Sequence, residues 1–198
     1  EDAVKKIFVA KGRPSDNPLI VHIAKLEDLE PLVKEIPEKV KIMADKFWPN
    51  ALTMIMKKSD KVSDVVSGNL DTVAVRMPKS DYARAIIEAC GCPLAAPSAN
   101  LSGSPSPTNA KYVYDDMNGR IPLIIDGGNC EIGVESTVIS FAEDTRQILV
   151  GTGAEATVAF AGNVKNATFV EGVLTIERNS GDNLTLDFND IASAKQTM

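Results

Sequence analysis

The sequence has few of the residues that build metal sites and disulfides. It contains one histidine, His22, and three cysteines among 198 residues. Because an odd number of cysteines cannot form a closed disulfide framework, we expect free thiols in a reducing compartment. Cys90, Cys92 and Cys130 could be joined by His22 around zinc, but the Cys-Gly-Cys spacing is poor for a structural zinc site. We therefore expect no metal held by the protein.

Long apolar runs and a targeting sequence are also absent. No apolar stretch approaches the roughly 18 residues that a membrane-spanning helix needs, and residues 1–5 lack the basic start of a signal peptide. We expect a cytoplasmic protein without a membrane partner. The formal net charge of −6 argues against a protein that coats nucleic acid through bulk charge, but it leaves room for a local basic cleft.

The common nucleotide and hydrolase signatures are missing as well. The sequence contains no Gly-x-x-x-x-Gly-Lys-Ser/Thr, no Gly-x-Gly-x-x-Gly and no Gly-x-Ser-x-Gly. What remains is the composition of an ordinary globular protein, with 44% hydrophobic and 24% charged residues. A nucleotide would therefore be held by a less common architecture.

Hydrophobic periodicity predicts an α/β fold. Apolar residues at helical spacing predict helices ending at residue 11 and covering 29–36, 40–47 and 81–90, and short apolar runs predict strands at 52–56, 72–77, 94–96, 122–126 and 136–141. Several connections are too short for a helical crossover, so we expect a twisted, open, mixed sheet with flanking helices.

The pattern changes near residue 150. Residues 184–189 alternate strictly between apolar and polar side chains, and residues 172–178 resemble a second strand. We therefore predict two parts: residues 1–150, which form the α/β domain, and residues 151–198, a β-hairpin-like tail of unassigned role.

Residues 11–19 read as an anion-binding loop. Lys11 and Arg13 lie two apart, so on extended backbone both cations could face one phosphate chain. Pro14, Asn17 and Pro18 stiffen the loop, as a preorganised anion site requires. The alternative is a solvated basic loop.

Residues 95–106 form a second polar segment. Hydroxyl and amide side chains, including those of Ser98, Asn100 and Ser106, follow a predicted strand in a loop that also holds glycine and proline. Such groups can bind phosphate and ribose without adding charge. For any one of them, a plain surface turn is the alternative.

Three further polar residues interrupt or border predicted strands. His22 lies in an apolar stretch, where it is either a core histidine or a ligand contact. Arg76 interrupts a strand of apolar residues, so its charge needs a structural ion pair or an anionic ligand. Ser136 lies at the mouth of a strand after a loop with glycines, which allow close backbone approach to a ligand.

These motifs together resemble the YrdC-like family of L-threonylcarbamoyladenylate synthases. The resemblance covers residues 1 to about 150 in family order and rests on five stretches. They are Lys-Gly-Arg-Pro-Ser-Asp-Asn-Pro-Leu-Ile-Val-His (11–22), Phe-Trp-Pro through Leu-Thr (47–53), Val-Ala-Val-Arg-Met-Pro (73–78), Ala-Pro-Ser-Ala-Asn-Leu-Ser-Gly (96–103) and Asp-Gly-Gly through Glu-Ser-Thr-Val (126–138).

The resemblance implies a nucleotidyltransferase that forms threonylcarbamoyl-AMP and pyrophosphate from L-threonine, bicarbonate or CO2, and ATP with Mg²⁺. The product would feed threonylcarbamoyladenosine modification of tRNA, with tRNA or the transfer proteins as further partners. By motif, the residues implied to bind ATP are Lys11, Arg13, Asn17, Ser98 and Ser106, and those implied to bind threonine are His22, Arg76 and Ser136. No covalent or acid–base catalytic residue is implied, because positioning and charge compensation suffice.

The sequence departs from the family pattern in two places. Family members have a first strand and a Pro-Thr-Glu-Thr-Val-Tyr-Gly-Leu-Gly-like segment with a threonine-binding hydroxyl, which this sequence does not contain. An ATP-contacting arginine of the family is replaced by Val150. Loss of one charge-assisted contact costs about 1.5–3 kcal/mol. A catalytically impaired fragment and an RNA-binding module are therefore the alternatives to an active synthase.

Overall fold

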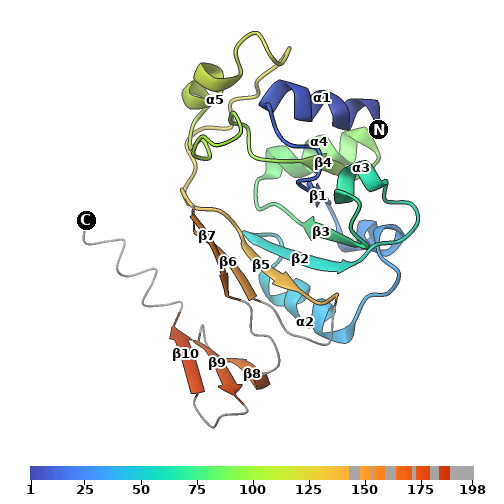
Figure 1. Ribbon diagram of the computed structural model, residues 1–198, viewed down its shortest axis with the longest axis vertical. Coiled ribbons are helices and arrows are strands. Elements are labelled where there is room, and N and C mark those ends of the chain that lie inside the picture. The colour runs from blue at the N-terminus through green and yellow to red at the C-terminus, as the bar shows by residue number, and fades with distance from the viewer. Residues whose placement is uncertain (143–147, 153, 159–163, 171–172, 179–182, 188–198) are drawn as a thin grey trace, which may run out of the picture.

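The fold is an open mixed sheet with flanking helices (Figure 1). The computed structural model describes residues 1–142, 148–152, 154–158, 164–170, 173–178 and 183–187. The seven-stranded sheet has the order β4-β1-β3-β2-β5-β6-β7. β1 pairs parallel with β3, and β2 pairs parallel with β5, whereas the other neighbours are antiparallel. The predicted fold class is confirmed.

The strands are short and mostly apolar. Their bounds are β1 Ile20–His22, β2 Leu52–Lys57, β3 Thr72–Arg76, β4 Leu94–Ala96, β5 Thr137–Ser140, β6 Ile148–Thr152 and β7 Ala154–Val158. β6 extends across residue 150, and its Val150 is the register partner of Thr137 in β5. The division of the chain at residue 150 stays a prediction.

The described residues form five α-helices. They are α1 Asp2–Lys11, α2 Glu38–Phe47, α3 Asp64–Ser67, α4 Asp81–Cys90 and α5 Ala110–Met117. Three of them, α3, α4 and α5, begin with a side-chain cap. The Ser80 hydroxyl accepts from the Ala83 amide at the start of α4, and Gly91 ends that helix in the left-handed conformation. Sequence periodicity did not predict α3 or α5.

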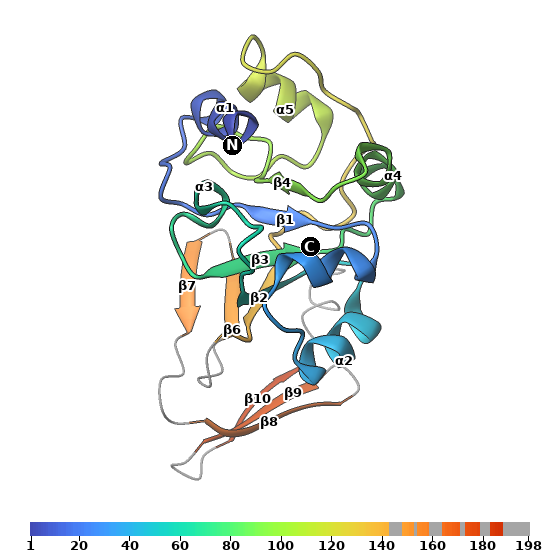
Figure 2. The ribbon, with the colours of Figure 1, turned by 90° about the vertical axis from the view of Figure 1, so that its right-hand side faces the viewer.

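The two faces of the sheet have different chemistry. Alternate residues of a strand point to opposite faces. On one face, Val21, Met54 and Val75 join the buried core, onto which the apolar side of α2 packs through Val40 and Ala44. The other face carries the alternate positions, and Figure 2 shows α1 and α5 lying together beyond the β4 edge, away from α2.

Two predicted elements differ from the structure. Residues 29–36 are not one α-helix: a 3₁₀ helix covers Leu26–Leu32, and Val33 then forms an isolated bridge with Lys58. Pro31 explains the change, because it has no amide hydrogen and disfavours the α conformation in the residue before it.

The predicted strand at 122–126 is also wrong. This segment has a bend at residue 122 and otherwise no regular secondary structure, and its Leu123 and Ile125 side chains are exposed. A strand needs a neighbouring strand for its backbone hydrogen bonds, and none pairs with this segment in the described residues.

The chain beyond β7 contributes a second sheet. β8 Val164–Val170, β9 Val173–Arg178 and β10 Asn183–Asp187 form a three-stranded antiparallel sheet of order β10-β9-β8. β9 and β10 coincide closely with the two strands predicted in the tail. The turn between them lies outside the described residues.

Candidate functional site

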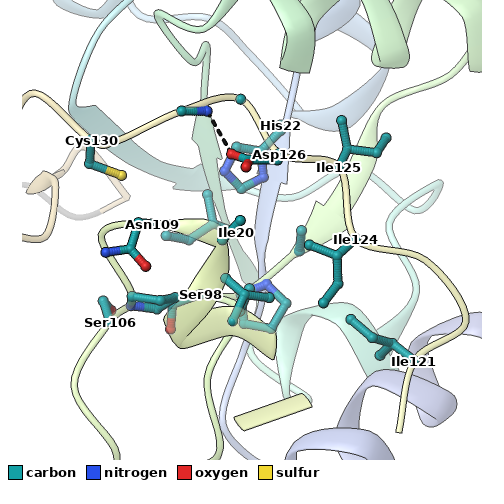
Figure 3. Close-up of a pocket in the computed structure, with 18 of the residues that line it drawn as sticks. Ile20, His22, Ser98, Ser106, Asn109, Ile121, Ile124, Ile125, Asp126 and Cys130 are labelled. Carbon is teal, nitrogen blue, oxygen red and sulfur yellow. Dashed lines mark hydrogen bonds between the residues drawn. The ribbon is translucent and has the colours of Figure 1, made fainter. Parts of the chain in front are cut away.

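A cavity of about 490 Å³ opens on the polar side of the sheet. Its wall combines strand residues of β1 and β3 with the loops that follow β4 and precede β5. In Figure 3, Ile121, Ile124 and Ile125 line one side, and Ser106, Asn109 and Cys130 lie opposite them. The cavity thus joins an apolar wall to a polar one.

Five of the eight predicted site residues line this cavity. They are His22, Arg76, Ser98, Ser106 and Ser136. The other three, Lys11, Arg13 and Asn17, are absent from its described lining. The structure therefore brings together all of the predicted threonine-binding residues and two of the predicted ATP-binding residues.

The sheet register places the threonine-binding candidates in one row. His22 of β1 is the register partner of Arg76 of β3, which in turn is the partner of Thr53 of β2. Ser136 immediately precedes β5, in which Val138 is the partner of Thr53. Paired residues project to the same face of a sheet, so this polar row lies opposite the apolar core.

The surroundings of His22 favour its neutral form. Burial lowers the pKa of its imidazole, and the positive charge of Arg76 lowers it further. Its Nδ1 atom is buried and has no hydrogen-bond partner among the described residues. This atom is inaccessible to solvent, so His22 borders the cavity through other atoms of its side chain or backbone.

Arg76 is oriented by backbone. Its Nε donates to the carbonyl oxygen of Asn50 at 3.1 Å. Burial lowers the pKa of the guanidinium from its high ordinary value, and the negative charge of Glu135 opposes that shift. Arginine stays protonated in proteins, so Arg76 presents a fixed cation to the cavity.

Ser136 is paired with a residue that we did not single out from the sequence. Its hydroxyl lies 2.8 Å from the hydroxyl of Thr53, and the exposed fractions of these two residues are 5% and 0%. The sequence signal was available, because Thr53 is a polar residue in the buried apolar run Leu-Thr-Met-Ile-Met.

Ser98 and Ser106 line the loop side of the cavity. The Ser106 hydroxyl donates to a carboxylate oxygen of Glu135, another lining residue that was not singled out from the sequence. Figure 3 also shows the Asp126 carboxylate accepting from the Gly128 amide, at 2.9 Å. One carboxylate, that of Glu135, is therefore bonded to a predicted phosphate ligand, whereas Asp126 lies nearer His22 (Figure 3).

Lys11 is buried beneath this loop, with 4% of its surface exposed. Its ammonium donates to the carbonyl oxygens of Ser98 and Asn100, the latter at 2.6 Å, and to the Asn100 side-chain oxygen at 3.4 Å. Burial lowers the pKa of Lys11, as does the nearby charge of Arg13. All three ammonium donors are thus directed at the protein, and a phosphate contact by Lys11 stays a prediction.

Arg13 and Asn17 bind each other. The Arg13 guanidinium donates to the Asn17 side-chain oxygen at 2.6 Å and to the Pro18 carbonyl at 2.9 Å. These bonds hold the loop in the fixed shape that its prolines predicted. Both residues would have to exchange partners to bind ATP, and their predicted contact to it is untested.

Metal-binding groups are sparse. Within the described residues, no three or more His, Cys, Asp or Glu side chains are placed to hold a metal ion. Cys90, Cys92 and Cys130 are exposed and free. Cys130 lines the cavity wall.

Comparison with known proteins identifies the family. The Sua5/YciO/YrdC family model, described as "Telomere recombination", matches residues 1–150. The chain belongs to the Sua5/YciO/YrdC family. This membership agrees with the resemblance found from the motifs.

Two curated members of the Sua5/YciO/YrdC family are especially similar to the chain. The threonylcarbamoyl-AMP synthase of Pyrococcus abyssi is 58% identical over 72% of this chain and 42% of its own length. The threonylcarbamoyl-AMP synthase of Bacillus subtilis is 57% identical over 75% of this chain and 43% of its own length. The chain therefore spans less than half the length of these relatives.

A solved Sua5 structure supports the same assignment. The crystal structure of P. abyssi Sua5 complexed with L-threonine has a TM-score of 0.74 and 56% identity, and the match covers 75% of this chain and 43% of that one. The fold of the chain therefore matches that of a protein crystallised with L-threonine.

Among the described residues, no helix has the length and apolar character needed to cross a membrane.

Proposed function

We propose that the chain forms threonylcarbamoyl-AMP and pyrophosphate from L-threonine, CO2 or bicarbonate, and ATP. The observation that carries this proposal is the convergence of His22, Arg76 and Ser136 with Ser98 and Ser106 in one cavity. The 57–58% identity to curated threonylcarbamoyl-AMP synthases supports it.

The chemistry needs two bond-forming steps. The neutral amine of threonine attacks the carbon of CO2 and loses a proton, which gives a carbamate. A carbamate oxygen then attacks the α-phosphorus of ATP while the bond to the β-phosphate oxygen breaks, so pyrophosphate leaves with the electron pair. Neither step requires a covalent enzyme intermediate, and catalysis depends on positioning and on compensating charge.

The proposed amino-acid subsite is the polar row of the sheet. The Arg76 cation would bind the carboxylate of threonine, because guanidinium groups form strong charge-assisted bonds to carboxylates. The lowered pKa of His22 favours a neutral imidazole, which would add no second positive charge near the threonine amine. Ser136 supplies a further hydrogen-bonding group from the end of the row.

The proposed nucleotide subsite is the loop side. Ser98 and Ser106 would bind ATP through hydroxyl groups, and Arg13 and Asn17 would join them from the neighbouring loop. Mg²⁺ would reach the site on the triphosphate, which fits a cavity whose described carboxylates, those of Asp126 and Glu135, do not form a closed set of metal ligands. When bound, the ion offsets phosphate charge.

The product would supply tRNA threonylcarbamoyladenosine modification. An acyl adenylate is an activated donor, and the proposed consumer is a transferase that acts on tRNA. We propose a cytoplasmic location, where ATP and tRNA are both present.

Pyrophosphate release tests the function. The 198-residue chain should release pyrophosphate when ATP, Mg²⁺, L-threonine and bicarbonate are all present, and mass spectrometry should detect threonylcarbamoyl-AMP. Omission of L-threonine or bicarbonate is the control and should abolish release. Absence of threonine-dependent release across a range of Mg²⁺ concentrations would disprove the proposal.

A further inference from the structure

Thr53 is a fully buried polar residue beside the proposed amino-acid subsite. It lies in β2, and none of its surface is exposed. Its neighbours in β2, Leu52 and Met54, point into the apolar core, whereas Thr53 points to the face that carries Arg76. It is absent from the described cavity lining, so it can act on a ligand only through another residue.

The residue through which Thr53 can act is Ser136. The two hydroxyl oxygens are 2.8 Å apart, and either could be the donor. Among the described residues, Ser136 is the hydrogen-bond partner that the structure gives to the Thr53 hydroxyl. A hydroxyl left as a buried donor without an acceptor costs free energy. Ser136 differs, because it also borders the cavity and can donate to a ligand there.

This asymmetry decides the direction of the hydrogen bond. If Thr53 donates to Ser136, every buried hydrogen has an acceptor, and the Ser136 hydrogen is free to turn toward the cavity. If Ser136 donates instead, the buried hydroxyl hydrogen of Thr53 has no acceptor. The first arrangement is favoured, and it makes Ser136 a hydrogen-bond donor toward the ligand.

We infer that Thr53 is a positioning residue that fixes Ser136 as a donor to a carboxylate oxygen of the bound amino acid. The inference rests on the proposed function and names the group that Ser136 recognises. The nearby charge favours that group, because Arg76, the register partner of Thr53, lines the same cavity and attracts an anion. The chain of contacts runs from β2 through Ser136 to the ligand.

A double-mutant cycle tests the inference by calorimetric titration of L-threonine. Thr53→Val keeps the shape of the side chain and removes the hydroxyl, and we expect it to raise the Kd about fivefold. Ser136→Ala removes the proposed contact and should raise the Kd about tenfold or more. In the double variant, Thr53→Val should add nothing to the effect of Ser136→Ala.

Two further variants separate positioning from a general structural role. Thr53→Ser keeps the hydroxyl and should restore a Kd close to that of the unaltered chain. Ser67→Ala removes another buried hydroxyl, which donates to the Asp64 carbonyl in α3, and should leave the Kd for L-threonine unchanged. ATP affinity should not change in Thr53→Val.

The outcomes that overturn the inference are distinct. If Thr53→Val raised the Kd for L-threonine equally in the unaltered chain and in the Ser136→Ala variant, Thr53 would not act through Ser136. If Thr53→Val weakened the binding of L-threoninamide as much as that of L-threonine, donation to a carboxylate would be contradicted, because a neutral carbonyl accepts a weaker hydrogen bond. Failure of the unaltered chain to bind L-threonine would overturn the proposed function as well, whereas binding without coupling would overturn this inference alone.

Discussion

The two halves of the cavity are built in different ways. The proposed threonine residues lie in or beside paired strands, so the register of β1, β3, β2 and β5 fixes their spacing. The proposed ATP residues lie in loops held by side-chain hydrogen bonds, such as those from Lys11 to Ser98 and Asn100. Four substitutions, three of them with a matched control variant, test this difference.

The largest effect is expected from Lys11→Met, which removes the support of the loop. Two backbone carbonyls and one side-chain oxygen would lose their donor, so the free energy of unfolding should fall by about 2–3 kcal/mol. ATP affinity should fall with it, while threonine affinity is kept. Urea unfolding and titration of each ligand would measure this.

Lys5→Met is the matched control for that substitution. Lys5 lies in the same helix, and its ion pair with Asp2 is exposed, with 3.6 Å between the charged atoms. Exposed pairs contribute little to stability, so neither measurement should change. Weakened ATP binding by Lys11→Met with unaltered unfolding would instead indicate a direct phosphate contact.

Arg76→Ala tests the strand-based half. Loss of a charge-assisted bond to the threonine carboxylate should raise the Kd for L-threonine about ten- to a hundredfold, with little change in Tm. The control is Arg84→Ala, since Arg84 donates to the Pro78 and Lys79 carbonyls outside the described cavity lining. A lower Tm with unchanged threonine binding would assign Arg76 a structural role.

Glu135→Gln should have a smaller effect of opposite sign. The carboxylate of Glu135 lines the cavity beside Ser106, where it would repel a triphosphate. Its neutralisation should lower the Kd for ATP about two- to threefold at low salt, and the gain should shrink as salt increases.

Glu131→Gln makes the same change in net charge outside the described lining. Glu131 pairs with Lys79 in an exposed ion pair at 2.9 Å. Equal gains in ATP affinity for both variants would assign the effect to net charge, not to the position of Glu135.

The smallest effect is a pH dependence from His22. Its pKa in the folded chain is lowered by burial and by Arg76, so the unfolded chain binds the proton more readily. The contribution of His22 to the free energy of unfolding is fully present above the unfolded pKa of about 6.5. It is lost as the pH decreases from there toward the lower folded pKa. His22→Gln should reduce this slope in urea unfolding between pH 5 and 8, and an unchanged slope would exclude His22 as its cause.

Much of the fold followed from periodicity. Ser80 and Gly91 bound α4 where capping chemistry placed them, and the strands around Thr72 and Leu94 were recognisable from short apolar runs. Residues 122–126 have the composition of a strand, but composition does not reveal whether a neighbour will pair with them. Pro31 marked a helix interruption that apolar spacing alone concealed.

The candidate site was harder to predict than the fold. Motifs led to His22, Arg76 and Ser136, yet their common face became visible only through the register of strands far apart in the sequence. The same long-range pairing explains why Thr53 was missed. Lys11 was singled out from the sequence because of its charge, but its binding partners were not predictable. The carbonyl groups that surround its ammonium come from a loop 87–89 residues away in the sequence.

The division of the sheet into an apolar and a polar face has a consequence for mutational scanning. Along β3, Val73 and Val75 belong to the core, whereas Arg76 belongs to the cavity. If growth and protein abundance are measured for every substitution in the strand, substitutions at core positions should lower the abundance of the protein. Substitutions at the alternate positions should leave abundance unchanged and lower growth through weaker ligand binding. Such a readout would map the two faces of the strand without any structure determination.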